Sequence, residues 1–415
     1  MKRVIAVFVV MAMLVSVLAG CGGGSGTTST PSAPSGQSGG SGGSSGSTSS
    51  GAGAPAAQSA SDFKGEIKIG VLSADLTALF GQMMKNGIQM AIDEYNEQGG
   101  VNGYKLVAVV EDTQSKPDVA LNAAQKLLGA NEVTAIIGPH HSSNVFAIEG
   151  IVRNADVPFI IGGTNPGIPK LENPNIFGVR TNDTICARAA AAFIADYPGV
   201  TKVAVLTLSD DFGEGGKQIS TAYFDEIGMP YMAESHNIGD TDMSATIMKV
   251  KNAGCDAVFI WTLGEFDILI KQLYEFGFVV PTVSNPSLVN TQTIQNLDRE
   301  WLVGRYCTSD FVFNSPAPVT RQFVEKFREL YNVDVDNGGA CYYSGAKVLI
   351  EAMLRCSDPT DRAEIKEQLL KTKDFETPVG IYNARPEINQ QLIWGINIVT
   401  LNDDLQVEFI KYVQQ

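Results

Sequence analysis

The sequence predicts an α/β protein of two lobes, each a parallel sheet covered by helices on both faces. Strand patterns and amphipathic helix patterns alternate from residue 66 onward, as in successive βαβ units. The alternation restarts near residue 202, so that Phe80-Gly81 and Phe212-Gly213 occupy matching places in the two halves. The chain from 62 to 415 also exceeds what one typical hydrophobic core holds together.

The first half contains four expected strands, marked by aliphatic and β-branched runs at 66–72, 105–111, 133–138 and 157–161. Apolar residues recur at three- and four-residue steps from Phe80 to Tyr95 and indicate one face of a helix. Gly99-Gly100 ends that helix, and a second helical pattern covers 118–128.

The second half repeats this order. Its expected strands are 202–206, 231–235 and 257–261. The helical patterns between them end near Ile227 and cover 245–253. The two halves are therefore expected to share a topology.

The N-terminus has the composition of a secretory signal. Lys2 and Arg3 precede an uncharged apolar run that ends in Leu18-Ala19-Gly20-Cys21. A cysteine in that place resembles a bacterial lipobox, where the thiol is lipidated and the chain is cut just before it. We therefore expect a signal peptide at 1–20 and a mature chain that begins at the lipidated Cys21.

A flexible tether is expected at 21–61. After Cys21 it consists almost entirely of Gly, Ser, Ala, Thr, Pro and Gln, without charge, and such a chain cannot bury a core. No other apolar run is long enough to span a bilayer. The folded part is therefore expected outside the cytoplasm, anchored to the cell membrane, at the cell surface or in the periplasm.

The composition narrows the class of partner. The chain has 45 acidic and 30 basic residues, a net charge of −15, which argues against nucleic acid and against an anionic bilayer surface. Beyond Cys21 five cysteines remain, without a CxxC pair or zinc-ligand spacing, so we expect no metal and no cofactor. One disulfide among the five stays open.

Candidate binding residues follow the expected strands, because ligands of open α/β sheets collect at the carboxyl ends of strands. Ser142 and Ser143 should open a helix, and Gly162-Gly163-Thr164 follows the next strand. Hydroxyls and free backbone N–H groups there suit a carboxylate, although a plain N-cap or turn is the alternative for each. Phe80, Phe212 and Trp261 supply aromatic walls or belong to the core.

The motifs of common enzymes are absent from the part of the sequence that is expected to fold. From residue 62 onward it contains no GxSxG, no HExxH and no GxGxxG after a strand, and the GxSxG matches in the Gly/Ser-rich tether follow from its composition. The segment 212–218 is only loosely similar to a phosphate loop, since Asp211 stands where the first glycine belongs. We expect no catalytic residues and no enzymatic activity.

Several short motifs follow one another along the chain: Gly70-Val71-Leu72 with Gly81, Gly99-Gly100-Val101-Asn102-Gly103, Ile136-Ile137-Gly138-Pro139, Thr164-Asn165-Pro166, Arg180-Thr181, Asp211-Phe212-Gly213 and Tyr343-Ser344-Gly345-Ala346. With these motifs the chain from 65 to 415 resembles the type I periplasmic solute-binding proteins of ABC importers, in particular the leucine/isoleucine/valine-binding branch. The resemblance implies two Rossmann-like lobes joined by a three-stranded hinge, with the ligand cleft between them.

The resemblance also implies three crossings between the lobes, near Asn182-Asp183, Ser309-Asp310 and Val379-Gly380. Lobe one is then 62–182 plus 310–379, and lobe two is 183–309 plus 380–415. The ligand-binding residues that it implies, together with their neighbours in the same loops, are Phe80, His141, Ser142, Ser143, Gly162, Gly163, Thr164, Phe212, Trp261 and Glu265.

The chain departs from amino-acid binders of this family in one loop. They often hold the α-ammonium with an acid from the segment equivalent to Ser284-Asn285-Pro286-Ser287, which has none here, so Glu265 or Asp211 would substitute. The expected function is a monomer that delivers a small solute, first an amino acid of the branched-chain type, to the membrane subunits of an ABC importer. The alternatives are a binder of an aromatic or other apolar carboxylate, a ligand-presenting sensor lipoprotein, and an extracellular enzyme.

Overall fold

A computed structural model describes residues 63–385 and 390–414. The expected signal peptide at 1–20, the lipidated Cys21 and the tether at 21–61 lie outside the described residues. The elements of the first lobe are β1 Glu66–Ser73, α1 Leu79–Glu97, β2 Lys105–Asp112, α2 Pro117–Leu128, β3 Ala135–Ile137, α3 Ser142–Ala155, β4 Phe159–Ile161, η1 Pro169–Leu171, β5 Ile176–Gly178, α10 Pro318–Tyr331, α11 Asn337–Leu354, α12 Arg362–Leu369, β11 Phe375–Thr377 and β12 Gly380–Tyr382.

The second lobe is built from the middle of the chain and its C-terminal strands. Its elements are α4 Asp183–Ala195, β6 Val203–Leu208, α5 Asp211–Ile227, β7 Tyr231–His236, α6 Ser244–Asn252, β8 Ala257–Trp261, α7 Phe266–Glu275, β9 Thr282–Ser284, η2 Pro286–Val289, α8 Thr291–Asn296, α9 Arg299–Leu302, β10 Tyr306–Ser309, β13 Gly395–Leu401 and β14 Val407–Gln414. The strands and helices expected from the sequence are confirmed, with ends that differ by a few residues.

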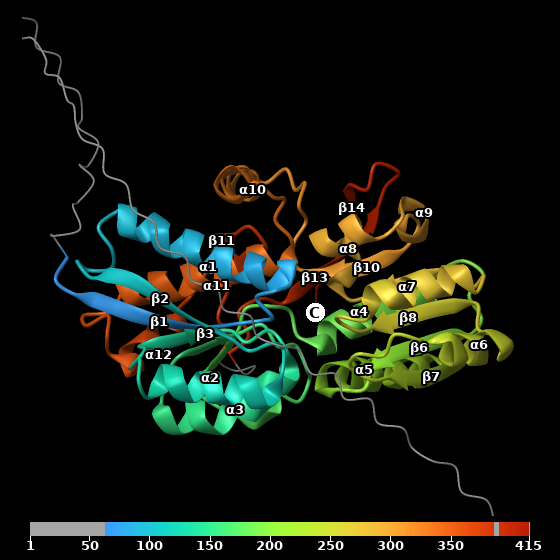
Figure 1. Cartoon of the computed structure of the whole chain (residues 1–415), viewed down its shortest axis with the longest axis horizontal. Helices are drawn as coiled ribbons and strands as arrows, with labels where there is room; N and C mark the ends of the chain where they lie inside the picture. The colour runs from blue at the N-terminus through green and yellow to red at the C-terminus, as the bar shows by residue number, and fades with distance from the viewer. Residues whose placement is uncertain (1–62, 386–389, 415) are drawn as a thin grey trace, which may run out of the picture. The chain divides into compact units, whose positions relative to one another are not determined.

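Each lobe has one main sheet. In the first, the strand order is β2-β1-β3-β4-β5 and all neighbours are parallel. In the second, β7, β6, β8, β9 and β10 are parallel, and β13 and β14 continue the sheet in antiparallel pairing. Figure 1 shows α1 and α11 on one side of the first sheet and α2 and α3 on the other. The α/β class with two lobes is therefore confirmed.

The cores follow from the alternation of side chains along the strands. In β1, Ile67, Ile69 and Val71 pack with α1 and α11, whereas Leu72 packs with α2 and α3. In β8, Val258 and Ile260 face α6 and α7, and the intervening residues, including Phe259, face α4 and α5. Helices therefore cover both faces of each sheet at these parallel strands. This explains why β8 and residues 69–72 of β1 are apolar without a regular polar alternation.

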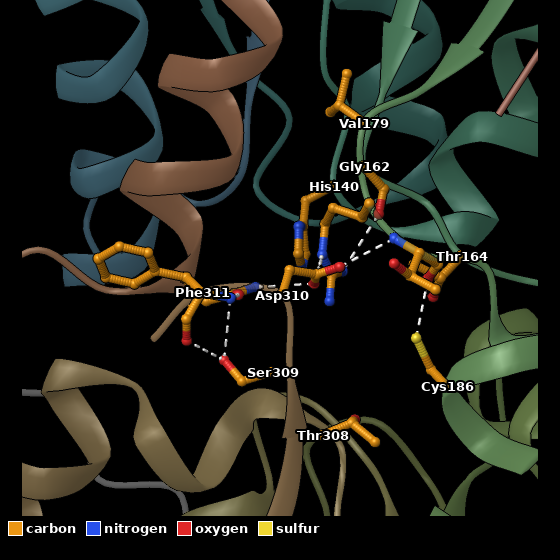
Figure 2. Close-up of polar contacts among 12 residues, drawn as sticks. His140, Gly162, Thr164, Val179, Cys186, Thr308, Ser309, Asp310 and Phe311 are labelled. Carbon is orange, nitrogen blue, oxygen red and sulfur yellow. Dashed lines mark hydrogen bonds and ion pairs between the residues drawn. The ribbon is translucent and has the colours of Figure 1, made fainter. Parts of the chain in front are cut away.

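Asp310 joins two of the connections between the lobes. Its buried carboxylate forms an ion pair with Arg180, with 3.1 Å between Oδ2 and Nε, and accepts the Thr181 backbone N–H at 2.9 Å. Figure 2 shows Asp310 at the centre of this network, between Gly162 and Ser309. The Thr181 hydroxyl donates at 2.7 Å to the Gly395 carbonyl on the third connection. These contacts place all three connections side by side.

The packing of the chain after β11 bears on the position of the third connection. Tyr382, Leu392 and Ile393 pack in the core of the first lobe. The chain joins the sheet of the second lobe at Gly395, where β13 begins. The family resemblance implies this crossing near Val379-Gly380, which in the structure lies at the turn between β11 and β12. We therefore propose the same two lobes with residues 380–385 and 390–393 assigned to the first.

The five cysteines of the described chain, Cys186, Cys255, Cys307, Cys341 and Cys356, are buried free thiols. The Cys186 thiol contacts the Thr181 carbonyl at 3.1 Å, and the Cys356 thiol contacts the Ala352 carbonyl at 3.3 Å. They behave as small core residues, and the disulfide left open by the sequence is not formed among them.

Replacing Asp310 with asparagine should destabilise the fold strongly. The Asp310→Asn variant keeps an acceptor for Thr181 but leaves the Arg180 charge buried without its counter-ion, which costs about 3–5 kcal/mol. Denaturant unfolding measures this loss. The matched control is Glu226→Gln, which removes one partner of the exposed Arg188–Glu226 pair and should change stability little. Equal losses for the two variants would contradict the assignment.

Candidate functional site

A cavity of about 410 Å³ lies where the strands of both lobes end. In the first lobe it is lined by residues that follow β1, β2 and β3, and in the second by residues that follow β6, β8 and β9. Parallel sheets collect ligands at this edge. Among the lining residues are Phe80, His140, His141, Arg180, Phe212, Glu265 and Asn285.

Aromatic and imidazole rings form the wall in the first lobe. The centroids of Phe80 and His140 lie 4.6 Å apart, those of His140 and His141 lie 5.7 Å apart, and the Tyr342 hydroxyl is 3.3 Å from His140 Nδ1. Burial lowers the pKa of His140 well below its ordinary value and lowers the pKa of His141 to about 4. Both imidazoles are therefore uncharged at neutral pH and contribute shape and hydrogen bonding rather than positive charge.

Two expected aromatic residues occupy different layers of the second lobe. Phe212 lines the cavity and stacks on Trp261, with ring centroids 5.8 Å apart. Trp261 stacks in turn on Phe259 at 5.2 Å, is 1% exposed and does not line the cavity. Phe212 therefore presents its ring to the cavity, and Trp261 supports that ring from behind.

Glu265 is the buried acid that the second lobe contributes to the cavity lining near the start of α7. It is 7% exposed, and its Oε1 accepts the Gly239 backbone N–H at 2.7 Å. Asn285 also lines the cavity: its Nδ2 donates to Ser287 Oγ at 3.0 Å, while its buried Oδ1 has no partner among the described residues. The loop after β9 thus offers a neutral acceptor at the place where an acid is missing.

The segment around Ser142 is more deeply placed than the sequence indicated. Ser142 Oγ accepts the backbone N–H groups of Thr164 and Asn165, both at 3.2 Å, so this hydroxyl braces the loop after β4. Ser142 and Ser143 are the first two residues of α3, and His141 stands at the N-cap position. The buried Thr164 hydroxyl oxygen has no hydrogen-bond partner among the described residues.

Gly162 and Gly163 permit close packing at the end of β4. A Cβ on Gly162 would overlap the hydroxyl of Tyr342, and one on Gly163 would lie 2.9 Å from Val145 Cγ2. Neither glycine lines the cavity, nor do Ser142, Ser143 and Thr164. The structure therefore brings Phe80, His141, Phe212 and Glu265 together at the cavity surface and places the other expected residues behind it.

Sequence reasoning missed several lining residues. Arg180 donates from Nη1 to the Gly162 carbonyl at 3.3 Å and lines the cavity, although its sequence motif indicates only the family resemblance. Asn337 reaches the cavity from the first turn of α11, far along the chain. Asp75 follows β1 directly, so the tendency of ligands to bind at the carboxyl ends of parallel strands is a signal that could have identified it. Asn337 had no local signal, because only the chain crossing brings α11 to this edge.

The described residues contain no group of three or more His, Cys, Asp or Glu side chains that could hold a metal ion. Within 63–385 and 390–414, no helix combines the length and apolar character that crossing a bilayer requires.

A cavity lined by two α/β lobes at their strand ends is typical of the class of two-lobed solute-binding proteins. The chain belongs to the periplasmic binding protein family, whose model matches residues 66–406. Membership implies a location outside the cytoplasm. Members of this family bind solutes and are not enzymes, so the expected absence of catalysis agrees with it.

Individual relatives agree with this class. The chain is 29% identical to a Leu/Ile/Val-binding protein homolog 2 of Brucella abortus over 330 residues, 76% of this chain and 85% of that protein. A leucine-binding protein LivK of Thermotoga maritima superposes with a TM-score of 0.76 at 25% identity, covering 84% of this chain and 98% of that one. A solute-binding protein of an ABC transporter from Rhodopseudomonas palustris, in complex with 3,4-dihydroxybenzoic acid, gives a TM-score of 0.74 at 18% identity over 84% and 97% of the chains.

Asp183 should make the stability of the protein depend on pH. Burial raises its pKa to about 8, whereas an aspartate in an unfolded chain titrates near ~3.9. The folded protein therefore holds this proton more tightly, and the stability that the neutral form contributes at low pH is lost as the pH rises toward 8.

The Asp183→Asn variant cannot ionise at this position. The Tm of the wild type should therefore fall relative to the Tm of the variant as the pH rises from 5 to 8. Thermal melts at one-unit intervals measure the difference. Asp404→Asn, at an exposed carboxylate, is the control and should run parallel to the wild type. Parallel curves for Asp183→Asn would show that Asp183 is already ionised in the folded protein.

Proposed function

We propose that the protein is a monomeric, lipid-anchored, extracytoplasmic solute-binding protein that delivers a small carboxylate solute to an ABC importer. The cavity lined by both lobes is the observation that supports this proposal. Solute contacts from both sides form completely only when the lobes are closed, so the solute stabilises the closed form. The importer's membrane subunits would then recognise that form.

An amino acid of the branched-chain type is the first candidate for the solute. The Brucella relative is named as a Leu/Ile/Val-binding protein homolog and the Thermotoga relative as a leucine-binding protein. The apolar side chains of Phe80, Leu208, Phe212 and Leu263 line the cavity and suit an aliphatic side chain. The loop after β9 has no acid, and among the acids that line the cavity Glu265 is the buried one, so we propose it as the partner of the α-ammonium. Asn285 Oδ1 is the second acceptor on that side.

An aromatic or other apolar carboxylate is the second candidate. The same missing acid favours it, because a solute without an ammonium needs no negative partner from that loop. Phe80, His140 and Phe212 supply ring faces, and Arg180, whose charge Asp310 balances, also lines the cavity. The Rhodopseudomonas relative in complex with a dihydroxybenzoic acid shows that this fold accepts such a solute.

A matched pair of solutes separates the two candidates. Leucine and 4-methylpentanoate differ only in the α-ammonium, and 3,4-dihydroxybenzoate represents the aromatic class. Calorimetry on protein that has been unfolded and refolded, to remove any carried solute, should show leucine binding more tightly than 4-methylpentanoate. The reverse order would favour the second candidate, and no binding of any of the three would overturn the carboxylate proposal.

Glu265→Gln should weaken leucine binding by about tenfold or more, because the ammonium loses its charged partner. Binding of 4-methylpentanoate should stay unchanged, since it has no group for Glu265. Glu226→Gln, an exposed exchange of the same type, is the control. If both solutes weakened equally, Glu265 would be a structural residue rather than the ammonium partner.

The lipid anchor has its own test. Labelling of cells with a radioactive fatty acid should mark the wild-type protein and not the Cys21→Ser variant, whose hydroxyl does not accept the lipid. The variant should also move from the membrane fraction to the soluble fraction. Equal labelling of the two proteins would refute lipidation at Cys21.

A further inference from the structure

The two lobes touch directly at a place beside the cavity. In the first lobe, the contact comes from the loop after β4, where Asn165 and Pro166 stand. In the second, it comes from the first turns of α5, where the Asp211 carbonyl accepts a hydrogen bond from Asn165 Nδ2. Gly215 lies beside this bond, and a Cβ on it would stand 2.6 Å from Asn165 Nδ2 and 2.8 Å from Pro166 Cδ.

The first lobe holds Asn165 in a fixed orientation. Its backbone N–H donates to Ser142 Oγ at 3.2 Å, and its carbonyl accepts from Asn182 Nδ2 at 3.2 Å. Its side-chain Oδ1 accepts the Gly167 N–H at 2.6 Å. Because Oδ1 is engaged within its own loop, the Nδ2 group is directed toward the second lobe before the lobes meet.

The second lobe offers a matching surface. Asp210 caps α5 by accepting the Gly213 N–H at 2.8 Å, which fixes the first turn that carries the Asp211 carbonyl. A glycine inside a helix is unfavourable compared with alanine, so the presence of glycine at position 215 calls for a structural explanation. The explanation is lack of space next to the first lobe, since even the methyl group of an alanine would overlap the rigid ring of Pro166.

Asn165, Pro166 and Gly215 do not line the cavity. We propose that Asn165 and Gly215 form a closure latch, a pair of positioning residues that stabilises the closed lobes and sets solute affinity without contacting the solute. This proposal rests on the proposed solute-binding function. The apparent affinity of a protein that binds in one conformation scales with the population of that conformation, so a contact made only on closure raises the affinity for every solute.

Gly215→Ala on the full chain tests the latch, with Gly150→Ala as the matched control. Gly150 is an exposed glycine inside α3, and a Cβ there would have no atom within 4 Å. Both exchanges improve helix propensity, so neither variant should melt below the wild type. Only Gly215→Ala should bind the tighter of leucine and 4-methylpentanoate about tenfold more weakly, through faster dissociation.

Asn165→Asp gives a second route to the same answer. The exchange keeps the Oδ1 acceptor for Gly167 but replaces the Nδ2 donor with an oxygen that faces the Asp211 carbonyl. Affinity should again fall about tenfold while the Tm is retained. Unchanged affinity in both variants would overturn the latch, and so would a large loss of Tm in Gly215→Ala, which would make Gly215 a packing residue.

Small-angle X-ray scattering without any solute separates this proposal from the proposed function. The latch predicts a larger radius of gyration for Gly215→Ala than for Gly150→Ala, because the closed form is less populated. If neither carboxylate bound the wild type but the radii differed, the solute assignment would fail and the latch would stand. Identical radii would overturn the latch.

Discussion

The carboxylate of Asp310 is buried, and the arrangement of the two lobes depends on the charge that it shares with Arg180. It also accepts the backbone of Thr181, whose hydroxyl reaches the third connection at Gly395. A charge taken out of water is tolerated only with a well-placed counter-ion. The pair therefore ties these connections together in the structure.

Residues that follow the strands of both sheets line one cavity. The first lobe contributes uncharged imidazoles and aromatic rings, and the second contributes Phe212, Glu265 and the polar loop after β9. An apolar surface with a few directed polar groups is what a small-solute site needs. Affinity then combines the solute contacts with whatever contact the lobes make directly.

The segment from Gly162 to Pro166 shows how one loop serves several purposes. Its glycines allow Tyr342 to pack against the end of β4, its backbone is braced by Ser142, and its Asn165 side chain reaches α5. The family resemblance implies that Ser142, Gly162 and Thr164 bind the solute, whereas in the structure these three residues do not line the cavity.

The sequence alone determined the alternation of strands and helices, the two-lobed plan and the strand-end position of Phe80, His141, Phe212 and Glu265, because these follow from local periodicity and the geometry of parallel sheets. Only the tertiary structure decided that Trp261 stands behind Phe212 and that Tyr382, Leu392 and Ile393 pack in the core of the first lobe. It also decided that Arg180 and Asn337 reach the cavity. Those outcomes depend on contacts between segments far apart in the chain, which no local pattern encodes.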